Sequence, residues 1–434
     1  MSDTKSFNIA IVGGGISGIS LAIGLYKKNV PFTVYESASK FGEIGAGLGF
    51  GPNAVVAMGL ISPDIVAGYE RCVTHGWKSK ERDWFTVRVG DERKAGPDGI
   101  LKQKEKEGLK VGDPIFDIRY TNDGLAGGVH RAHFLDEMLK LIPGSVSKFG
   151  KRLVDITTAD GSEDVVLHFA DGTTAQHSAV VGCDGIKSKT RDILLGEEGG
   201  KALFSGKYAY RGLVPMEKAV ELLGEELAWN NQLFMGYHGH LLTFPIEKGK
   251  TMNVVAFSSC DTWTDPQWVI KTTKEKMLED FSTWGPMVVK IIEAMGKRDI
   301  WALFNDPPAS TYYGTNPRVC LLGDAAHATT PHQGSGAGMC IEDSYILSGL
   351  MGEAKSVQDL DKVFKAYDEV RRPRTQRLVE TSREAGMLYE FELEGDDLEA
   401  IEKNFQARMS WIWDEDLQKE LGKALSIFYA NVEG

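Results

Sequence analysis

Three glycines near the start of the chain have the spacing of a phosphate-binding loop. Gly13, Gly15 and Gly18 follow the pattern G-x-G-x-x-G. The first permits a tight turn, the second lets the backbone approach a pyrophosphate, and the third lets a helix pack close to a strand. Glu36 follows about 20 residues later, where a carboxylate binds both ribose hydroxyls of an adenosine. We predict that this stretch, Ser17 included, binds the adenosine and pyrophosphate of a dinucleotide.

The segments on either side of this loop predict the strand–helix–strand unit that positions a phosphate. Residues 7–12 predict a short buried strand, residues 19–28 a helix and residues 32–35 a second strand. In this order, the first amides of the helix and the positive end of its dipole face the anion. The alternative, a glycine-rich turn with a surface glutamate, is disfavoured by the complete strand–helix–strand order.

Two later glycine–acid elements narrow the kind of dinucleotide. Gly182-Cys183-Asp184-Gly185 follows a buried strand, and Gly323-Asp324 follows another. An aspartate directly after a glycine at the end of a strand can hydrogen-bond a polyol chain. The glycine loop at 334–338 then offers bare backbone to a ring system. A nicotinamide dinucleotide needs no such second cradle, whereas a flavin with its ribityl chain does, so FAD is the predicted cofactor.

The composition is that of an ordinary globular protein with an acidic balance. The chain has 434 residues, of which 42% are hydrophobic and 25% charged, and its net charge is −12. This negative charge disfavours nucleic acid or an anionic membrane as a partner. For the same reason, an anionic substrate would need cationic side chains close to its binding site. Five cysteines without a C-x-x-C pair indicate reduced thiols in a cytoplasmic protein, and we predict no metal site. No run of about 18 apolar residues and no apolar signal region occurs, so we expect neither a membrane span nor secretion.

The predicted fold class is α/β, with three parts. The first is a discontinuous, Rossmann-like FAD-binding domain with an inserted β-meander; the second is a mostly antiparallel substrate-binding sheet; the third is a set of C-terminal helices. We assign residues 1–75, 105–195 and 305–365 to the FAD-binding domain, 76–104 and 196–304 to the substrate domain, and 366–434 to the helical segment.

The three glycine–acid elements in this order resemble the class A flavin-dependent aromatic hydroxylases, the para-hydroxybenzoate hydroxylase superfamily. The resemblance covers residues 6–195 and 205–375. Within that superfamily the chain looks most like the salicylate 1-monooxygenases, and fungal dearomatising phenol hydroxylases share several of the same stretches. These stretches are residues 50–55, 209–212, 239–245 and 327–334.

The resemblance implies non-covalent FAD and assigns residues to its parts. Glu36 would bind the adenosine ribose, Asp184 would lie near the pyrophosphate, and Asp324 would bind the ribityl chain. Further cofactor-binding residues would be Gly49, Arg131, Pro331, Gly336 and Ala337. NADH or NADPH would be the co-substrate without a Rossmann domain of its own, and Arg191 could guide it.

The chemistry implied by the resemblance is hydroxylation of an electron-rich ring by a flavin C4a-hydroperoxide. Attack at a carbon that bears a carboxylate would release CO₂, so salicylate would give catechol. An activated substrate of this kind is a dianion and needs cations. The catalytic candidates are Arg211, whose planar fork suits a carboxylate or phenolate, and His332, which could accept the phenol proton. Substrate-binding candidates are Arg88, Phe234 and Phe244.

Each candidate residue also has a structural interpretation. Arg211 could be an edge-strand arginine paired with an acid, and His332 could bond loop backbone. Arg88 has an even chance of facing a pocket, because side chains alternate along a strand. For each aromatic residue, core packing is a sufficient explanation.

Other functions stay open at this point. One is hydroxylation and dearomatisation of a bulkier fungal phenol without loss of CO₂, and another is a non-catalytic flavin redox sensor. A flavin-dependent halogenase is excluded, because the W-x-W-x-I-P motif is absent: acidic residues 414–416 follow Trp411-Ile412-Trp413. The expected partners are a small aromatic carboxylate, O₂ and NAD(P)H, and the protein is expected to be a monomer or homodimer.

Overall fold

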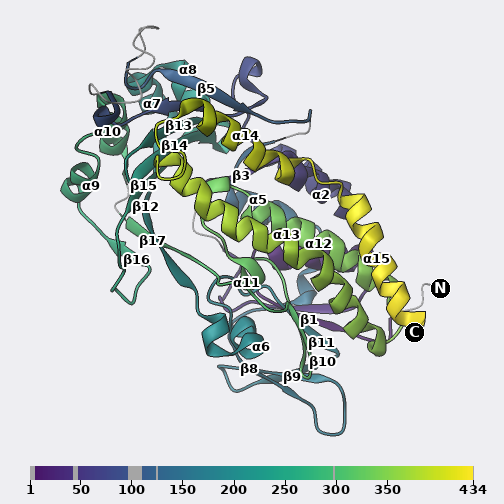
Figure 1. Cartoon of the computed structure of the whole chain (residues 1–434). Coiled ribbons are helices and arrows are strands. Elements are labelled where there is room, and N and C mark those ends of the chain that lie inside the picture. Colours follow the sequence, from purple (N-terminus) through teal and green to yellow (C-terminus); the bar gives the residue numbers. More distant parts are fainter. Residues whose placement is uncertain (1–4, 43–46, 96–109, 124–125, 297–298, 434) are drawn as a thin grey trace.

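The computed structural model describes residues 5–42, 47–95, 110–123, 126–296 and 299–433. Its main sheets lie toward opposite ends of the molecule, and the long helices α12 (Gly336–Glu353) and α13 (Leu360–Tyr389) run between them (Figure 1). In the part of the chain that the structure describes, no helix is both long and apolar enough to cross a membrane.

The first sheet contains the predicted strand–glycine–helix unit. Its six strands lie in the order β18-β19-β11-β1-β2-β7, and β1 pairs in parallel with both β2 and β11. The carboxyl ends of β1, β11 and β19 therefore meet at one edge, which brings the three glycine–acid elements together. The bounds are β1 (Ile9–Val12), α1 (Ile16–Lys27), β2 (Phe32–Tyr35), β7 (Ser147–Lys148), β11 (Ala179–Gly182), β18 (Tyr313–Thr315) and β19 (Arg318–Leu321).

The inserted meander is a separate three-stranded antiparallel sheet. It contains β8 (Leu153–Thr158), β9 (Val165–Phe169) and β10 (Thr174–His177). Residues 174–182 contain two strands that belong to different sheets, β10 in the meander and β11 in the first sheet. The chain changes sheet at Ser178, whose amide donates to the carbonyl of Asn8.

The largest sheet has eight strands in the order β16-β17-β12-β15-β14-β13-β4-β5. It is antiparallel apart from the pairing of β13 with β4. We assigned residues 114–119 to the FAD-binding part, but this segment is β5 and pairs with β4 in the large sheet. The boundary expected at residues 104 and 105 lies outside the described residues. The bounds are β4 (Asp83–Val89), β5 (Pro114–Arg119), β12 (Leu203–Pro215), β13 (Gln232–Gly236), β14 (Gly239–Ile246), β15 (Thr251–Ser259), β16 (Val269–Lys271) and β17 (Asp299–Asn305).

Shorter elements cover the sheets and join them. A two-stranded sheet of β3 (Gly47–Phe50) and β6 (Gly127–His130) lies between the two large sheets. Part of the glycine-rich loop before β3, residues 43–46, lies outside the described residues. The remaining helices are α2 (Pro52–Ile61), α3 (Pro63–Cys72), α5 (Arg131–Leu139), α6 (Lys189–Gly200), α7 (Met216–Leu223), α8 (Glu225–Trp229), α9 (Lys274–Asp280), α10 (Pro286–Ala294) and α11 (Asp324–His327).

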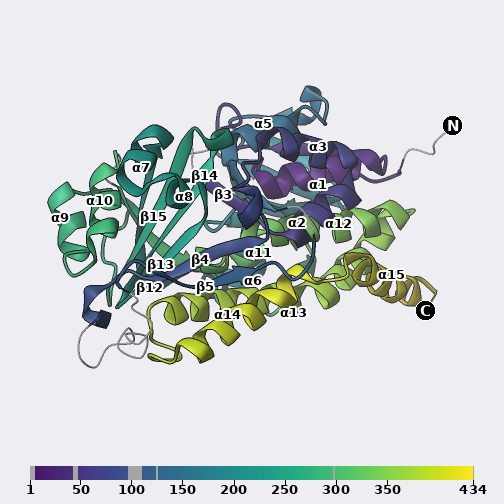
Figure 2. The same ribbon diagram turned by 90° about the horizontal axis from the view of Figure 1, so that it is seen from above.

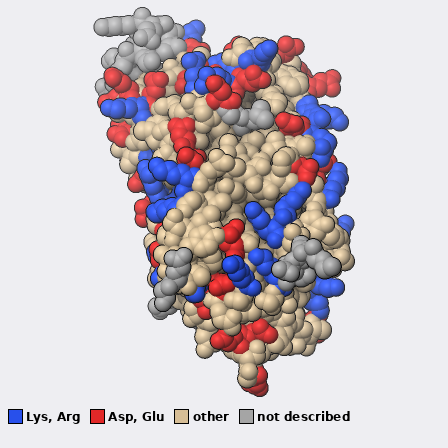
Figure 3. All heavy atoms as spheres, turned by 90° about the vertical axis from the view of Figure 1, so that its right-hand side faces the viewer, with Lys and Arg blue, Asp and Glu red and all other residues tan. Residues whose placement is uncertain are grey.

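The C-terminal residues form helices that pack on the body of the molecule. Helix α14 (Leu398–Trp413) contacts β5 and α2, and α15 (Leu417–Glu433) lies against α12 and α13 (Figure 2). These helices carry fully buried apolar side chains, among them Ile401, Phe405 and Met409. On the face of the molecule shown in Figure 3, basic and acidic side chains are interspersed.

Candidate active site

The glycine loop between β1 and α1 has the close contacts that a phosphate-binding loop requires. Gly13 has a φ of +106°, and a Cβ there would lie 2.2 Å from the carbonyl oxygen of Cys183. A Cβ at Gly18 would lie 2.0 Å from the carbonyl oxygen of Gly13. Glu36 Oε2 accepts from the amide of Gly14 at 2.9 Å, which places the carboxylate beside the loop. The structure therefore admits no larger side chain at Gly13 or Gly18 without rearrangement.

A groove of about 430 Å³ opens at this loop. It is lined by Gly13, Glu36 and Asp184, and four cationic side chains complete it: Lys151, Arg152, Lys187 and Lys189. Asp184 accepts from the Ser188 hydroxyl at 2.5 Å, so its carboxylate also orders the turn before α6. The size and shape of the groove and the positive charge of its four cationic side chains suit the adenosine and pyrophosphate of FAD.

The remaining predicted cofactor residues lie at or near the ends of elements outside this groove. Asp324 is exposed at the start of α11, and a Cβ at Gly323 would meet the Ser17 hydroxyl at 2.4 Å. A Cβ at Gly49 would have no neighbour within 4 Å, so the β3 backbone faces open space. Arg131 begins α5, Pro331 begins the turn before α12, and Gly336 and Ala337 begin α12 itself. The glycine loop, the acidic side chains at Glu36, Asp184 and Asp324, and the open backbone at Gly49 are groups that suit FAD.

A second cavity, of about 130 Å³, lies where the predicted flavin loops meet the large sheet. Residues 47–51 and 331–335 line one side. The other side carries Arg211 from β12 and aromatic side chains from four elements. These are Trp84, Phe85, Phe244, Phe257 and Trp413. A cavity that combines apolar aromatic walls with one cation is suited to an aromatic anion.

Arg211 is the cation of this cavity. Its guanidinium lies over the ring of Trp301, 5.4 Å from the centroid. Among the described residues it has neither a hydrogen-bond acceptor nor a carboxylate partner, so the alternative of an acid-paired edge arginine does not apply there. Burial lowers the pKa of Arg211, and the nearby charge of Arg131 lowers it further. A partly desolvated cation without an anion favours an anionic ligand.

His332 lines the same cavity and is buried. Its Nδ1 lies 3.3 Å from Nε2 of His240, and its carbonyl oxygen accepts from the Tyr389 hydroxyl at 2.9 Å. Burial holds the pKa of His332 well below the ordinary histidine value, and His240 adds to this effect. The imidazole is therefore neutral near pH 7, which is the form that can accept a proton.

The structure does not bring Arg88 and Phe234 to the cavity, so their predicted substrate-binding role is corrected. Arg88 donates to the side chain of Gln232 at 2.8 Å and to the carbonyl of Gly112 at 2.7 Å. Phe234 packs in the core on the far side of the sheet, because its neighbours Leu233 and Met235 face the near side. Phe244 does line the cavity.

The suggestion that Arg191 guides the nicotinamide cofactor is also corrected. Arg191 is fully buried and donates to the carbonyls of Ala326 and Pro307, both at 2.7 Å. It joins α6 to the segment around α11, and this structural role leaves no side-chain surface for a cofactor.

Several cavity residues were not predicted from the sequence, among them Phe85, Tyr120, Phe257 and Trp413. Trp413 was considered only as part of a halogenase motif, since it lies in the tail, about 200 residues after Arg211. Periodicity places such residues on a buried face but does not show which distant element faces them. His240 lay within a resemblance stretch, and its partnership with His332 needed the tertiary structure.

Comparison with known proteins agrees with this geometry. The family profile described as "FAD binding domain" matches residues 144–382. The chain is 38% identical to a 6-methylsalicylate 1-monooxygenase of Aspergillus terreus over 100% of this chain and 95% of the relative. It is 36% identical to a salicylate hydroxylase of Pseudomonas putida over 96% and 94% of the two chains.

Solved structures give the same result. The structure titled "Salicylate hydroxylase substrate complex" superposes with a TM-score of 0.82 at 32% identity and covers 98% of both chains. The FAD cradle, the aromatic cavity and these relatives agree. The chain therefore belongs to the FAD-binding-domain family of flavoprotein aromatic monooxygenases, and within it to the salicylate hydroxylase type.

Proposed function

We propose that the protein converts an ortho-hydroxybenzoate to a catechol with loss of CO₂, using NADH or NADPH and O₂, and that salicylate is the substrate. The observation that carries this proposal is Arg211, a cation in an aromatic cavity without a carboxylate partner among the described residues. A substrate carboxylate would complete this charge in a protein whose net charge is −12.

When bound, FAD would supply the redox chemistry, namely the acceptance of a hydride from the nicotinamide co-substrate and the activation of O₂. Gly13, Glu36 and Asp184 would hold its adenosine end, and Asp324 its ribityl chain. Gly49, Arg131, Pro331, Gly336 and Ala337 would border its ring end. The protein's own part is to bind and orient the substrate and to exclude water from the reacting ring.

The catalytic side chains have distinct roles in this proposal. Arg211 would pair with the carboxylate and hold the carbon that bears it toward the cofactor. His332 would accept the proton of the neighbouring hydroxyl and so make the ring electron-rich. Phe244 and Phe257 would pack against the ring from β14 and β15.

The lining of the cavity favours a small aromatic acid. Aromatic side chains and the cation Arg211 border a volume of about 130 Å³. A single ring that carries a carboxylate would use both features of this lining.

The experiment that tests the proposal is product identification with carboxyl-labelled salicylate. We expect NAD(P)H oxidation to be stimulated by salicylate, with one catechol and one labelled CO₂ for each NAD(P)H in coupled turnover. A hydroxylated product that keeps the label would contradict decarboxylation and favour the dearomatising alternative. Cofactor oxidation that salicylate does not stimulate would contradict salicylate as substrate.

A further inference from the structure

A line of buried polar side chains begins at His332 and leads away from the cavity. His332 Nδ1 lies 3.3 Å from His240 Nε2, and His240 Nδ1 lies 3.0 Å from Oε1 of Glu390. The other oxygen of Glu390 accepts from the ammonium of Lys207 and, at 3.0 Å, from the hydroxyl of Ser259. Both histidines, Glu390 and Lys207 are buried. His332 lies in the turn before α12, His240 in β14 and Lys207 in β12, and Glu390 directly follows α13. The line thus connects four distant elements.

The role given to His332 above does not explain this line. A histidine with only a structural role needs no more than one hydrogen bond to a backbone carbonyl. Four buried titratable groups carry a large desolvation cost unless each of them has a hydrogen-bond or ionic partner. Here each group does have an ordered partner, and the far end reaches the surface. Lys207 Nζ is 3.5 Å from Glu392, which in turn is 3.1 Å from the exposed His238.

The ionised carboxylate determines which nitrogen of each histidine carries the proton. A carboxylate can only accept, so Nδ1 of His240 must donate to Glu390. A neutral imidazole has a single N–H, so Nε2 of His240 accepts, and Nδ1 of His332 donates to it. Nε2 of His332 is then the nitrogen with a free lone pair, and it has no hydrogen-bond partner among the described residues.

The surroundings keep both rings neutral. Burial holds the pKa of His240 well below the ordinary histidine value, and the charge of Lys207 lowers it further. The same two causes act on His332, together with His240, while Glu390 opposes them. The uncharged neighbours are Phe257, stacked on His240 at 4.1 Å, and Tyr389, which bonds the His332 carbonyl.

We propose that Glu390 is a positioning residue that acts through His240 to make Nε2 of His332 the proton acceptor for the substrate hydroxyl. When the substrate O–H breaks, its proton goes to His332 Nε2. The Nδ1 proton of His332 passes to His240 Nε2, and the Nδ1 proton of His240 passes to Glu390. The negative charge thus moves from Glu390 to the substrate oxygen, and both imidazoles end neutral. This inference rests on the proposed function, since it requires a phenolic substrate.

The first test reads the protonated nitrogens directly, in FAD-loaded protein labelled with ¹⁵N-histidine and without substrate. The His332 signals are identified by their loss in His332→Asn. We expect the parent to carry its proton on Nδ1. In Glu390→Gln, Lys207 and Ser259 retain the amide oxygen as their acceptor, so the amide N–H donates to Nδ1 of His240. His240 then carries its proton on Nε2 and donates to Nδ1 of His332. The proton of His332 therefore moves to Nε2. A proton on Nε2 in the parent, or no change in the variant, would overturn the proposal.

The second test uses a nitro-substituted salicylate, which is coloured as its phenolate. We expect the bound probe to ionise at a lower pH in the parent than in free solution. Glu390→Gln should raise the midpoint by at least about one pH unit, because the acceptor is lost. The control is Glu384→Gln, on α13 but half exposed and paired with Arg408, and it should leave the midpoint unchanged. An unchanged midpoint in Glu390→Gln would overturn the proposal.

A further variant covers the case in which Glu390→Gln does not fold. His240→Phe keeps a ring against Phe257 and leaves the Lys207–Glu390 pair intact, and it should raise the midpoint in the same way. Folding is checked by circular dichroism and FAD content. If the probe does not bind the parent at all, the proposed substrate class is wrong, and the ¹⁵N measurement still decides the proton positions.

Discussion

At the scale of single residues, the site depends on two side chains whose ordinary chemistry is changed by burial. Arg211 keeps a charge without an anion among the described residues, and His332 is held neutral. Both line one small aromatic cavity. A cation for the carboxylate and a neutral base for the hydroxyl are the two groups that an ortho-hydroxybenzoate requires.

Replacing Arg211 tests the first of these groups. Arg211→Met should raise KM for salicylate by about 10- to 100-fold, since a hydrogen bond to a charged group contributes about 1.5–3 kcal/mol. FAD content should stay at the parent level. Arg211→Lys is the matched variant and should recover part of the loss, because it keeps the charge without the planar fork. Steady-state kinetics with FAD-saturated enzyme make the measurement, and parent-like constants in Arg211→Met would refute the role.

At the scale of elements, each wall of the site belongs to a different unit. In the proposed function, the turn after β1 would present glycine backbone to phosphate, and β12, β14 and β15 would present side chains to the substrate. Trp413 of α14 lines the same cavity. Because these elements come from distant parts of the chain, a change in one should affect one function and spare the others.

Gly18→Ala tests the phosphate turn. Its Cβ would lie 2.0 Å from the carbonyl oxygen of Gly13, so the turn must open and FAD affinity should fall at least tenfold. Gly422→Ala, in α15 with nothing within 4 Å of the new Cβ, is the control and should keep full FAD binding. Fluorescence titration of the apoprotein with FAD measures both. Equal affinity of Gly18→Ala and parent would contradict the assignment of this turn.

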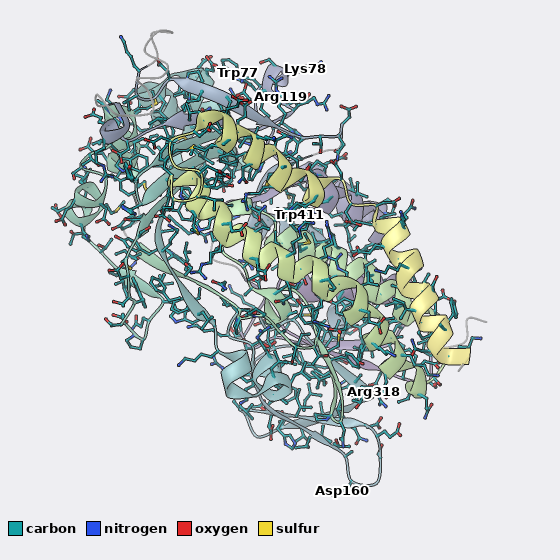
Figure 4. All side chains as sticks on the ribbon, in the orientation of Figure 1. Trp77, Lys78, Arg119, Asp160, Arg318 and Trp411 are labelled. Carbon is teal, nitrogen blue, oxygen red and sulfur yellow. The ribbon has the colours of Figure 1, made fainter. Side chains whose placement is uncertain are left out.

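Trp413→Leu tests the wall that α14 contributes. The smaller side chain should enlarge the cavity, raise KM for salicylate and increase turnover of 1-hydroxy-2-naphthoate relative to salicylate. Trp411→Leu is the control, because Trp411, labelled in Figure 4, stacks on Arg374 and Arg377 of α13 and is not among the residues lining the cavity. The ratio of the two kcat/KM values gives the result. A ratio that changes equally in both variants would rule out a specific role for Trp413.

At the scale of the whole molecule, a buried ionic network joins the C-terminal helices to the FAD-binding part. Arg371 of α13 bonds Asp343 and Glu342 of α12, both at 2.8 Å, and Glu420 of α15 at 2.7 Å. Asp343 also pairs with His327, at 2.6 Å, just after the Gly323-Asp324 turn. The tail is therefore bonded to the elements that hold the cofactor.

Removing the centre of this network should destabilise the whole protein. Arg371→Met removes the cation shared by three buried carboxylates, Glu342, Asp343 and Glu420, and we expect a loss of about 3–5 kcal/mol. Arg372→Met, one residue later, removes a partly exposed pair with Asp368 and should cost about 1 kcal/mol or less. Urea unfolding of the two variants at pH 7 compares them. Similar losses in both would show that the buried network contributes no more than a surface pair.

Glu342 and Asp343, the acids of this network whose pKa is lowered, predict how stability depends on pH, whereas burial raises the pKa of Glu420, which acts in the opposite direction. Burial raises the pKa of Glu342, but Arg374 and Arg371 outweigh it, so the pKa lies below its ordinary 4.5. Asp343 is likewise lowered, by His327 and Arg371 acting against burial. Acids with a lowered folded-state pKa stabilise the protein above their unfolded-state values, and this stability is lost as the pH falls through the folded-state pKa. Unfolding free energies measured from pH 7 to pH 3 should therefore fall below about pH 4.5, and less steeply in Arg371→Met.

The turns of the candidate cofactor site were predictable, because their signals are local. The turn at Gly13, the carboxylate at Glu36 and the Gly323-Asp324 turn each depend on a few consecutive residues after a short apolar strand. Their order along the chain implied a parallel sheet that gathers them at one edge, and β1, β11 and β19 do so. Arg211 was also identifiable, as the cation of an aromatic strand.

The substrate site was predictable only in part. Along β4 and β13 the alternation of side chains is clear, but which face is the cavity depends on what packs against the sheet, so Arg88 and Phe234 were misassigned. Trp413 reaches the cavity because α14 folds back on β5. Glu390 meets His240 only after α13 has crossed the molecule.

The sequence by itself determined the cofactor and the order of the elements, because backbone turns and apolar periodicity are set by neighbours along the chain. It indicated the family through the resemblance of its motifs. Only the tertiary structure decided which side chains line the aromatic cavity and which polar groups lie behind His332. Those properties depend on burial and on partners about 60 to 200 residues away, and long-range packing sets both.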